Sequence, residues 1–163
     1  MTPALKRNMA RLLGSLALAS PLLLGVTVPA HASTSKIYNS CSNGGWGTCL
    51  YFNSNGAGAT WGVDASVPDL IGYYYYCGAG VGDCLNEYAF SGGNGAGYPV
   101  KSNAASIDNG FTLSEQYVYT GSSYGGARQA INPDYQYTYG WVNLNSTLKN
   151  HDASLYAVSC GCG

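Results

Sequence analysis

Charged side chains are scarce in this chain. Its 163 residues include seven lysines and arginines, eight aspartates and glutamates, and two histidines. The basic residues Lys6, Arg7 and Arg11, together with His31, stand in the first 32 residues, and the remainder has a net charge of −4. Without a basic cluster, binding to nucleic acid or to an anionic membrane is not expected. His151 is the one histidine beyond residue 32, which excludes a multi-histidine metal site in that part.

The chain also lacks an apolar run of the length that a membrane-spanning helix needs. The main apolar stretch, residues 12–28, has seventeen residues and contains two serines and Pro21, whereas a span needs about twenty apolar residues. Basic residues precede this stretch and Ala30-His31-Ala32 follows it, which is typical of a signal peptide. We therefore expect residues 1–32 to be removed, and the mature protein to be secreted and free of the membrane.

Helical periodicity is missing as well. We expect residues 33–40 to be a flexible lead-in, and after them only the pair Leu144 and Leu148 has helical spacing, enough for one turn. β-forming residues are abundant instead, in short runs separated by Gly- and Asn-rich turns. The predicted strands are 48–52, 84–90, 116–120, 135–139 and 154–159. Residues 41–163 are thus expected to form one all-β domain, a sandwich or a barrel.

A weak internal repeat divides this domain into halves, at about 41–108 and 112–159. Tyr51 precedes Gly58 by seven residues, and Tyr119 precedes Gly126 by the same spacing. A serine follows in each half: Ser106 lies 48 positions after Gly58, and Ser154 lies 28 positions after Gly126. The first half therefore carries an insertion of about twenty residues, which we place around 73–92. Two β-units that each leave an apolar face uncovered should pack against each other.

Residues 119–126, YTGSSYGG, resemble the signature of the βγ-crystallin Greek key: an aromatic, four residues, an aromatic, one residue and Gly. The Gly permits a backbone conformation that a Cβ disfavours, and an aromatic can pack over the turn. The first half departs from the signature because Gly56 stands at the position of the second aromatic. The resemblance implies two Greek-key units packed as a βγ-crystallin-like sandwich.

The start of the domain resembles a more specific group. Cys41-x7-Cys49-Leu50-Tyr51 and the stretch 101–106 are similar to the streptomycete metalloproteinase inhibitors and their secreted, actinobacterial, βγ-crystallin-like relatives. This resemblance implies a secreted proteinase inhibitor, with a secreted protease as its partner. Inhibitory residues do not transfer from the family, since the inserted segment has no clear counterpart there.

The βγ-crystallin resemblance also implies a possible calcium site, at a segment of the form Asn/Asp-Asn/Asp-x-x-Ser/Thr-Ser, whose oxygen atoms suit a hard cation. The corresponding segments, 102–107 and 150–155, end in Ile107 and Leu155, and the first contains no carboxylate. The alternative, which we favour, is that Ser106 and Ser154 hydrogen-bond to the backbone of a neighbouring hairpin. We expect no metal and no cofactor.

All six cysteines follow residue 40, and an even number in an exported chain predicts a disulfide framework. We expect Cys77 to pair with Cys84, and Cys41 and Cys49 to pair either with each other or with Cys160 and Cys162. The first bond would close a loop of Gly78, Ala79, Gly80, Val81, Gly82 and Asp83. Because a pre-ordered loop loses less entropy on binding, this loop is our candidate inhibitory contact. The alternative is a stabilised hairpin without a partner.

The residues before this loop are Tyr73, Tyr74, Tyr75 and Tyr76. Successive side chains of a strand point to opposite faces, so two of these rings should be exposed if the other two are buried. Exposed rings suit stacking on sugars. A carbohydrate- or cell-wall-binding module is therefore the alternative function.

Evidence for catalysis is weak. Residues 121–125 match G-x-S-x-G, and Asp134 and His151 follow in the order of an α/β-hydrolase triad. A nucleophile elbow needs a following helix, however, and Pro133 and the β-pattern disfavour one, so we interpret Ser123 as a hairpin residue and His151 as a turn residue. Four residues could supply a pair of catalytic carboxylates of the glycosidase type: Asp64, Asp69, Asp83 and Glu87. The sequence does not give the distances between them. We therefore expect that this protein is not an enzyme.

Overall fold

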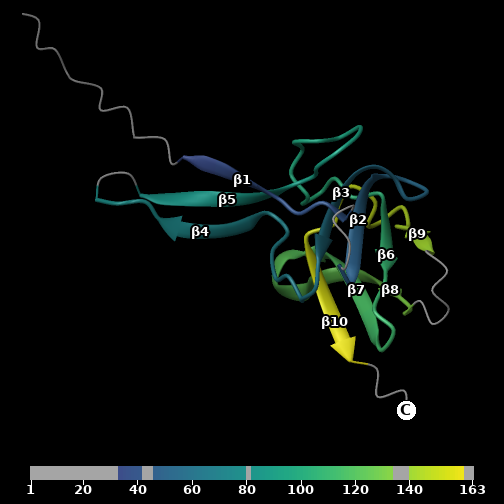
Figure 1. Cartoon of the computed structure of the whole chain (residues 1–163). Helices are drawn as coiled ribbons and strands as arrows, with labels where there is room; N and C mark the ends of the chain where they lie inside the picture. The colour runs from purple at the N-terminus through teal and green to yellow at the C-terminus, as the bar shows by residue number, and fades with distance from the viewer. Residues whose placement is uncertain (1–32, 42–45, 80–81, 134–139, 160–163) are drawn as a thin grey trace, which may run out of the picture.

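The structure is a computed structural model of the whole chain, and it describes residues 33–41, 46–79, 82–133 and 140–159 (Figure 1). The strands are β1 (Thr34–Tyr38), β2 (Thr48–Asn53), β3 (Ala57–Val63), β4 (Gly72–Tyr76), β5 (Asp83–Ala89), β6 (Ser106–Asn109), β7 (Ser114–Gly121), β8 (Gly125–Ile131), β9 (Trp141–Asn143) and β10 (Ser154–Ser159). A 3₁₀ turn, η2 (Ser122–Tyr124), joins β7 to β8. No helix among these residues is long and apolar enough to span a bilayer.

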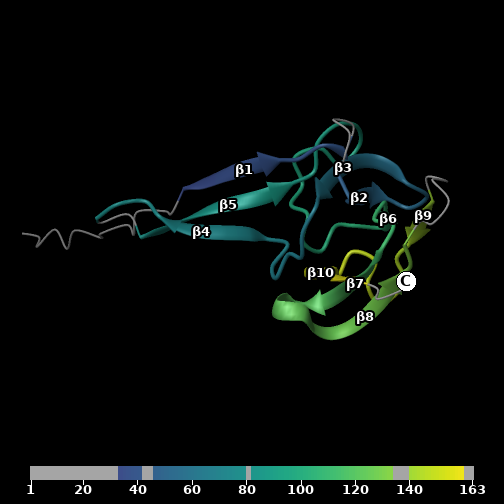
Figure 2. The same ribbon diagram turned by 60° about the horizontal axis from the view of Figure 1, so that its bottom comes forward.

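Two sheets face each other and enclose the core (Figure 2). One has the strand order β3-β2-β6-β9 and the other β10-β7-β8. The period-2 pattern explains the packing: in β7, Gln116 and Val118 are fully buried, whereas Tyr117 between them faces outward. Leu50 and Trp61 of the first sheet and Leu155 of the second are also buried. The predicted all-β class is confirmed.

Each half of the chain contributes a segment that pairs with a strand of the other half. β9, from the second half, pairs with β6 of the first half, with Val142 opposite Ile107. In return, Val67 of the first half forms an isolated bridge with Leu155 of β10, through two hydrogen bonds of 2.7 and 2.9 Å. Each sheet therefore contains segments of both halves, and the two Greek-key units form one βγ-crystallin-like sandwich, as predicted.

The repeated hairpins have matching backbone conformations. Gly58 has φ +84° and Gly126 has φ +80°, the left-handed region that favours glycine. At the position of the second aromatic, Gly56 and Tyr124 both have φ +63°. In the first half, the ring of Trp141 lies where a Cβ on Gly56 would be placed. A tryptophan from the second half thus covers the turn whose own aromatic is missing.

The two repeated serines fasten these hairpins. Ser106 Oγ donates to the Asn53 carbonyl at 2.6 Å and accepts from the Gly56 amide at 3.0 Å. Ser154 Oγ donates to the Gly121 carbonyl at 2.7 Å and accepts from the Tyr124 amide at 3.1 Å. The four hairpin residues occupy equivalent positions in the repeat. The interpretation of both serines as hairpin ligands is confirmed.

A third sheet, β1-β5-β4, projects from the sandwich as an arm (Figures 1 and 2). β4 and β5 are the insertion, and they pair as an antiparallel hairpin. β1 pairs with β5 in parallel, with Thr34 opposite Leu85 and Tyr38 opposite Ala89. The prediction of a flexible lead-in at 33–40 is therefore wrong, because Thr34–Tyr38 supplies an edge strand of the arm. The strand predicted at 135–139 lies outside the described residues.

Candidate functional site

Strand β4 exposes four consecutive aromatic rings. The exposed fractions of Tyr73, Tyr74, Tyr75 and Tyr76 are 49%, 63%, 40% and 71%. The expected alternation of buried and exposed rings is therefore not found. Alternation separates the rings into two pairs on opposite faces, but the arm extends beyond the sandwich, and neither face is covered there.

The backbone of β4 is also open along one side. Among the described residues β4 pairs with β5 alone, which leaves its outer row of amide and carbonyl groups unpaired. An edge strand of this kind can accept a further strand from another chain. β4 carries no charged side chain, and charges, especially lysines, are a common means of protecting an edge from such pairing.

Disulfides hold both the arm and the start of the sandwich. Cys77 and Cys84 form the predicted bond at the outer end of the arm, with Cα atoms 5.7 Å apart. Cys41 pairs with Cys49, Cα atoms 5.9 Å apart, which settles the alternative that the sequence left open. Gly80, Val81, Cys160 and Cys162 lie outside the described residues. The two bonds indicate an oxidising, extracytoplasmic environment.

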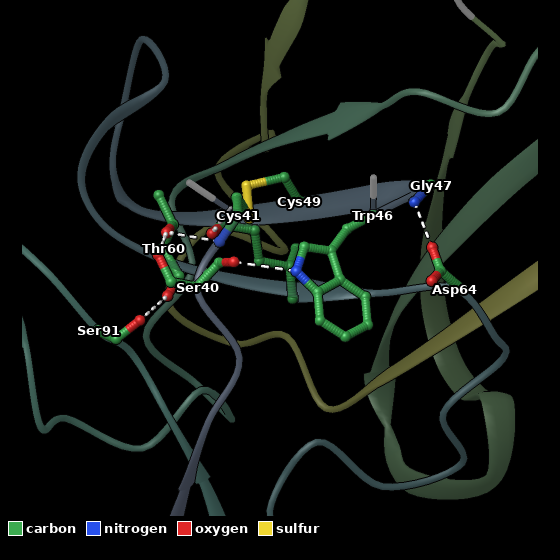
Figure 3. Close-up of a disulfide and its surroundings, with 9 residues drawn as sticks. Ser40, Cys41, Trp46, Gly47, Cys49, Thr60, Asp64 and Ser91 are labelled. Carbon is green, nitrogen blue, oxygen red and sulfur yellow. Dashed lines mark hydrogen bonds between the residues drawn. A yellow bond between two sulfur atoms is a disulfide. The ribbon is translucent and has the colours of Figure 1, made fainter. Parts of the chain in front are cut away.

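The Cys41–Cys49 bond lies in a hydrogen-bonded corner of the sandwich (Figure 3). The Cys41 amide donates to Thr60 Oγ1 at 3.2 Å, and the indole of Trp46 donates to the Ser40 carbonyl at 2.9 Å. Asp64 accepts from the Gly47 amide. This carboxylate therefore helps to hold the loop that the disulfide closes.

Two of the other candidate carboxylates form ion pairs. Asp69 accepts from Lys101 at 2.9 Å and from Ser122 at 2.8 Å, and Glu87 lies 3.8 Å from Lys36. Burial alone would raise the pKa of Asp69, but these hydrogen bonds and one from the Ile71 amide hold it below its usual value. Asp69 is thus ionised and unsuited to act as a general acid. Asp83, at the outer end of the arm, is exposed.

The G-x-S-x-G match has the geometry of a hairpin turn. Ser123 lies in η2 with φ +55°, exposed, between β7 and β8, and its amide donates to the Pro68 carbonyl at 2.6 Å. A strand follows where a nucleophile elbow needs a helix. His151 is exposed in a turn, and its Nδ1 lies 2.9 Å from the Lys149 carbonyl. Both interpretations from the sequence are confirmed; Asp134 lies outside the described residues.

The two segments considered for calcium meet at the junction of the halves. The Ser102 amide donates to the Asp152 carbonyl at 2.7 Å, and the Asn150 amide donates to the Ala104 carbonyl at 2.8 Å. Lys149 Nζ, beside the second segment, donates to Ser54 at 2.8 Å. No group of three or more His, Cys, Asp or Glu side chains that could hold a metal is found within the described ranges.

Asp152 is the junction residue that sequence reasoning missed. Its side chain is fully buried, Oδ1 accepts from the Ala104 amide at 2.9 Å, and Oδ2 has no hydrogen-bond partner. Burial raises its pKa to about 7, against the opposing effect of the backbone hydrogen bonds that it accepts. Nothing in the local sequence distinguishes this aspartate, because its burial results from the packing of one half on the other.

A second group of rings lies on the outer face of β10-β7-β8. The centroids of Tyr124 and Tyr156 are 4.9 Å apart, those of Tyr119 and Tyr124 6.0 Å, and those of Tyr117 and Tyr119 6.4 Å. The guanidinium of Arg128 lies 4.6 Å from the centroid of Tyr117 and covers that ring. These rings contact one another and a cation, whereas the closest ring contact of β4 is Tyr73 with Tyr88, at 6.3 Å between centroids.

Comparisons with known proteins give one structural neighbour. No family model and no curated protein matches this chain. A solved structure described as "Evolution of the eye lens beta-gamma-crystallin domain fold" aligns with a TM-score of 0.45 and 14% identity, over 71% of this chain and 89% of that chain.

Proposed function

We propose that this chain is an exported binding protein whose binding surface is the arm, and that its partner is a secreted proteinase. The observation that carries the proposal is the exposure of Tyr73–Tyr76 on an edge strand beyond the sandwich. Tyrosine is enriched at protein interfaces, where its ring supplies apolar area and its hydroxyl a hydrogen bond. Rings that the fold leaves half exposed contribute little to folding and remain available to a partner.

The burial energy that these rings offer is comparable with the cost of association. About 100 Å² of each ring surface is exposed, and its burial would be worth about 2–3 kcal/mol. Four rings thus approach about 10 kcal/mol, within the range of about 4–15 kcal/mol that association costs. Backbone pairing along the open edge of β4 adds to this sum. The Cys77–Cys84 bond holds the end of the arm and lowers the ordering entropy.

A proteinase is the partner class that agrees with the open edge of the arm and with the resemblance at residues 41–51. The open edge of β4 can add an extended segment of a partner as a further strand. The mature, oxidised protein should therefore inhibit a member of a panel of secreted metallo- and serine proteinases.

Variants identify the surface responsible. Replacing Tyr73–Tyr76 together by Ser should weaken inhibition by roughly a hundredfold or more, since the loss of even one or two rings removes about 3 kcal/mol. Tyr98→Ser is the matched control, because this tyrosine is 56% exposed but lies outside the arm. Replacing Cys77 and Cys84 together by Ser should weaken inhibition without unfolding the sandwich. A quadruple variant that keeps its circular dichroism and inhibits at full strength would exclude the arm as the inhibitory surface.

Polysaccharide binding is the second candidate, favoured by the placement of the four rings on two open faces. Sugar rings stack on flat aromatic surfaces. Retention on insoluble chitin, cellulose and peptidoglycan, measured with the same variants, separates the two functions. A polysaccharide-binding arm would lose retention with the tyrosines but keep it after the Cys77 and Cys84 replacement, because stacking does not require the closed end.

A further inference from the structure

A small polar pocket, separate from the arm, lies where the two halves of the sandwich meet. Its volume is about 230 Å³. The lining residues are Phe52, Asn53 and Ser54 at the β2–β3 turn, Asn103 and Ala105 before β6, and Lys149 and Asn150 before β10. Amides, a hydroxyl and an ammonium dominate this lining, and it contains no carboxylate. The volume is below the range of about 300–1,000 Å³ for drug-sized ligands, so the pocket suits a single ring or a smaller acid.

The walls of the pocket are fixed to one another by hydrogen bonds. The Asn53 carbonyl is held by Ser106 Oγ at 2.6 Å, and the Ala105 amide donates to the Tyr51 carbonyl at 2.9 Å. The Asn150 amide donates to the Ala104 carbonyl at 2.8 Å, which joins the wall from the second half to the first. The pocket is thus formed before any ligand arrives, and binding needs little further ordering.

Lys149 gives the pocket an uncompensated positive charge. Its Nζ donates to Ser54 Oγ at 2.8 Å, which leaves further N–H donors for a ligand. The other lysines in the described part of the chain, Lys36 and Lys101, lie 3.8 and 2.9 Å from carboxylates, whereas no described carboxylate lies within 4.0 Å of Lys149. In a domain with excess negative charge, this ammonium favours an anion and disfavours a divalent cation.

The remaining lining atoms can recognise hydroxyl groups. The side-chain amides of Asn53 and Asn150 make no hydrogen bond to another described residue, and each offers both a donor and an acceptor. A hydroxyl group also donates and accepts, so the amides match it. Phe52, whose ring lies 5.7 Å from that of Phe90 and 5.2 Å from that of Tyr98, forms an apolar wall. Such a wall suits the C–H face of a sugar.

We infer that this pocket binds a carboxylate flanked by hydroxyl groups, as found in an acidic sugar or in a free hydroxy acid. The carboxylate pairs with Lys149, and the hydroxyls bond to the amides of Asn53 and Asn150. The inference does not depend on the arm, so either proposal can fail without the other.

The experiment is a titration of the mature, oxidised protein with D-glucuronate, D-glucose and lactate, followed by ¹H–¹⁵N NMR. We expect D-glucuronate to shift the side-chain amides of Asn53, Asn103 and Asn150 at millimolar concentration. D-Glucose, which lacks the carboxylate, should bind at least roughly tenfold more weakly, the loss expected for one charge-assisted hydrogen bond. Lactate binding as tightly as D-glucuronate would identify a hydroxy-acid site, and much weaker lactate binding an acidic-sugar site; both support the inference.

Two variants test the role of the charge. Lys149→Met should lose at least roughly tenfold in affinity for D-glucuronate. Lys36→Met makes the same change in net charge outside the pocket and should bind normally. Added salt should weaken binding to the wild type and to Lys36→Met alike. Equal affinity for D-glucose and D-glucuronate, full affinity in Lys149→Met, or the absence of amide shifts at these residues would each overturn the inference.

Discussion

The buried carboxyl group of Asp152 should make the stability of this domain fall as the pH rises toward neutrality. Its pKa is about 7 in the folded state, against an ordinary value of 3.8. Asp152 therefore holds its proton more tightly in the folded state. The free energy of unfolding that it contributes is fully present below pH 4, decreases between pH 4 and pH 7, and is lost above this window. The difference between the two pKa values corresponds to about 4 kcal/mol.

Asp152→Asn isolates this effect. Asparagine keeps an oxygen that can accept from the Ala104 amide but cannot ionise. Relative to the wild type, the unfolding free energy of the variant should rise by up to about 4 kcal/mol between pH 4 and pH 8, or on the order of 10 °C in Tm at pH 8. Urea denaturation with the disulfides intact, followed by tryptophan fluorescence, measures it, since Trp61 is buried in the core.

Asp69→Asn provides a control of opposite sign. The pKa of Asp69 lies below its usual value, so this carboxylate stabilises the fold above the unfolded pKa and loses that effect as the pH falls. The asparagine variant should therefore be less stable than the wild type at pH 8, with a smaller difference at pH 3. If the difference in unfolding free energy between Asp152→Asn and the wild type does not change between pH 4 and pH 8, the pKa of Asp152 is not raised in the folded state.

Three further predictions concern maturation, the hairpins and calcium. Intact-mass spectrometry of the exported protein should show Ser33 as the first residue, and no mass increase on alkylation; two alkylated cysteines would contradict a complete disulfide framework. Ser106→Ala and Ser154→Ala should each lower the unfolding free energy by about 2 kcal/mol, because each strips two hairpin groups of their partner, and urea denaturation will show whether they do. Calorimetric titration with calcium should show weak or no binding, since Lys149 carries a positive charge beside one candidate segment; micromolar affinity would contradict this.

Short-range patterns in the sequence predicted the all-β class and part of the sandwich. The spacing from Tyr51 to Gly58 and from Tyr119 to Gly126 is set by one hairpin geometry, which is local and therefore visible in the sequence. The same holds for the disulfide between Cys77 and Cys84, because a short loop brings the two residues together. Among the sandwich strands, β2, β7 and β10 were predicted from local runs of β-forming residues, whereas β3, β6, β8 and β9 were not predicted.

Long-range pairing produced the errors. Thr34–Tyr38 contains β-forming residues, but its partner β5 lies about fifty positions away, and no local signal indicates a parallel pairing. Tyr73–Tyr76 was correctly predicted to lie on a strand. The exposure of its rings was not predicted, because it depends on the strand extending beyond the sandwich. The cover that Trp141 provides for Gly56, and the burial of Asp152, likewise result from contact between halves.

The parallel strand β1 determines where Ser33 lies. The Leu85 amide donates to the Ser33 carbonyl at 3.2 Å, and Ser33 Oγ lies 3.0 Å from the sulfur of Cys84. A chain cut after Ala32 would thus begin at the outer part of the arm, next to the disulfide. An affinity tag joined directly to Ser33 would emerge at the edge of the arm opposite to β4, with β5 between the tag and the tyrosines. The first residue of such a chain therefore belongs to the arm and not to the sandwich.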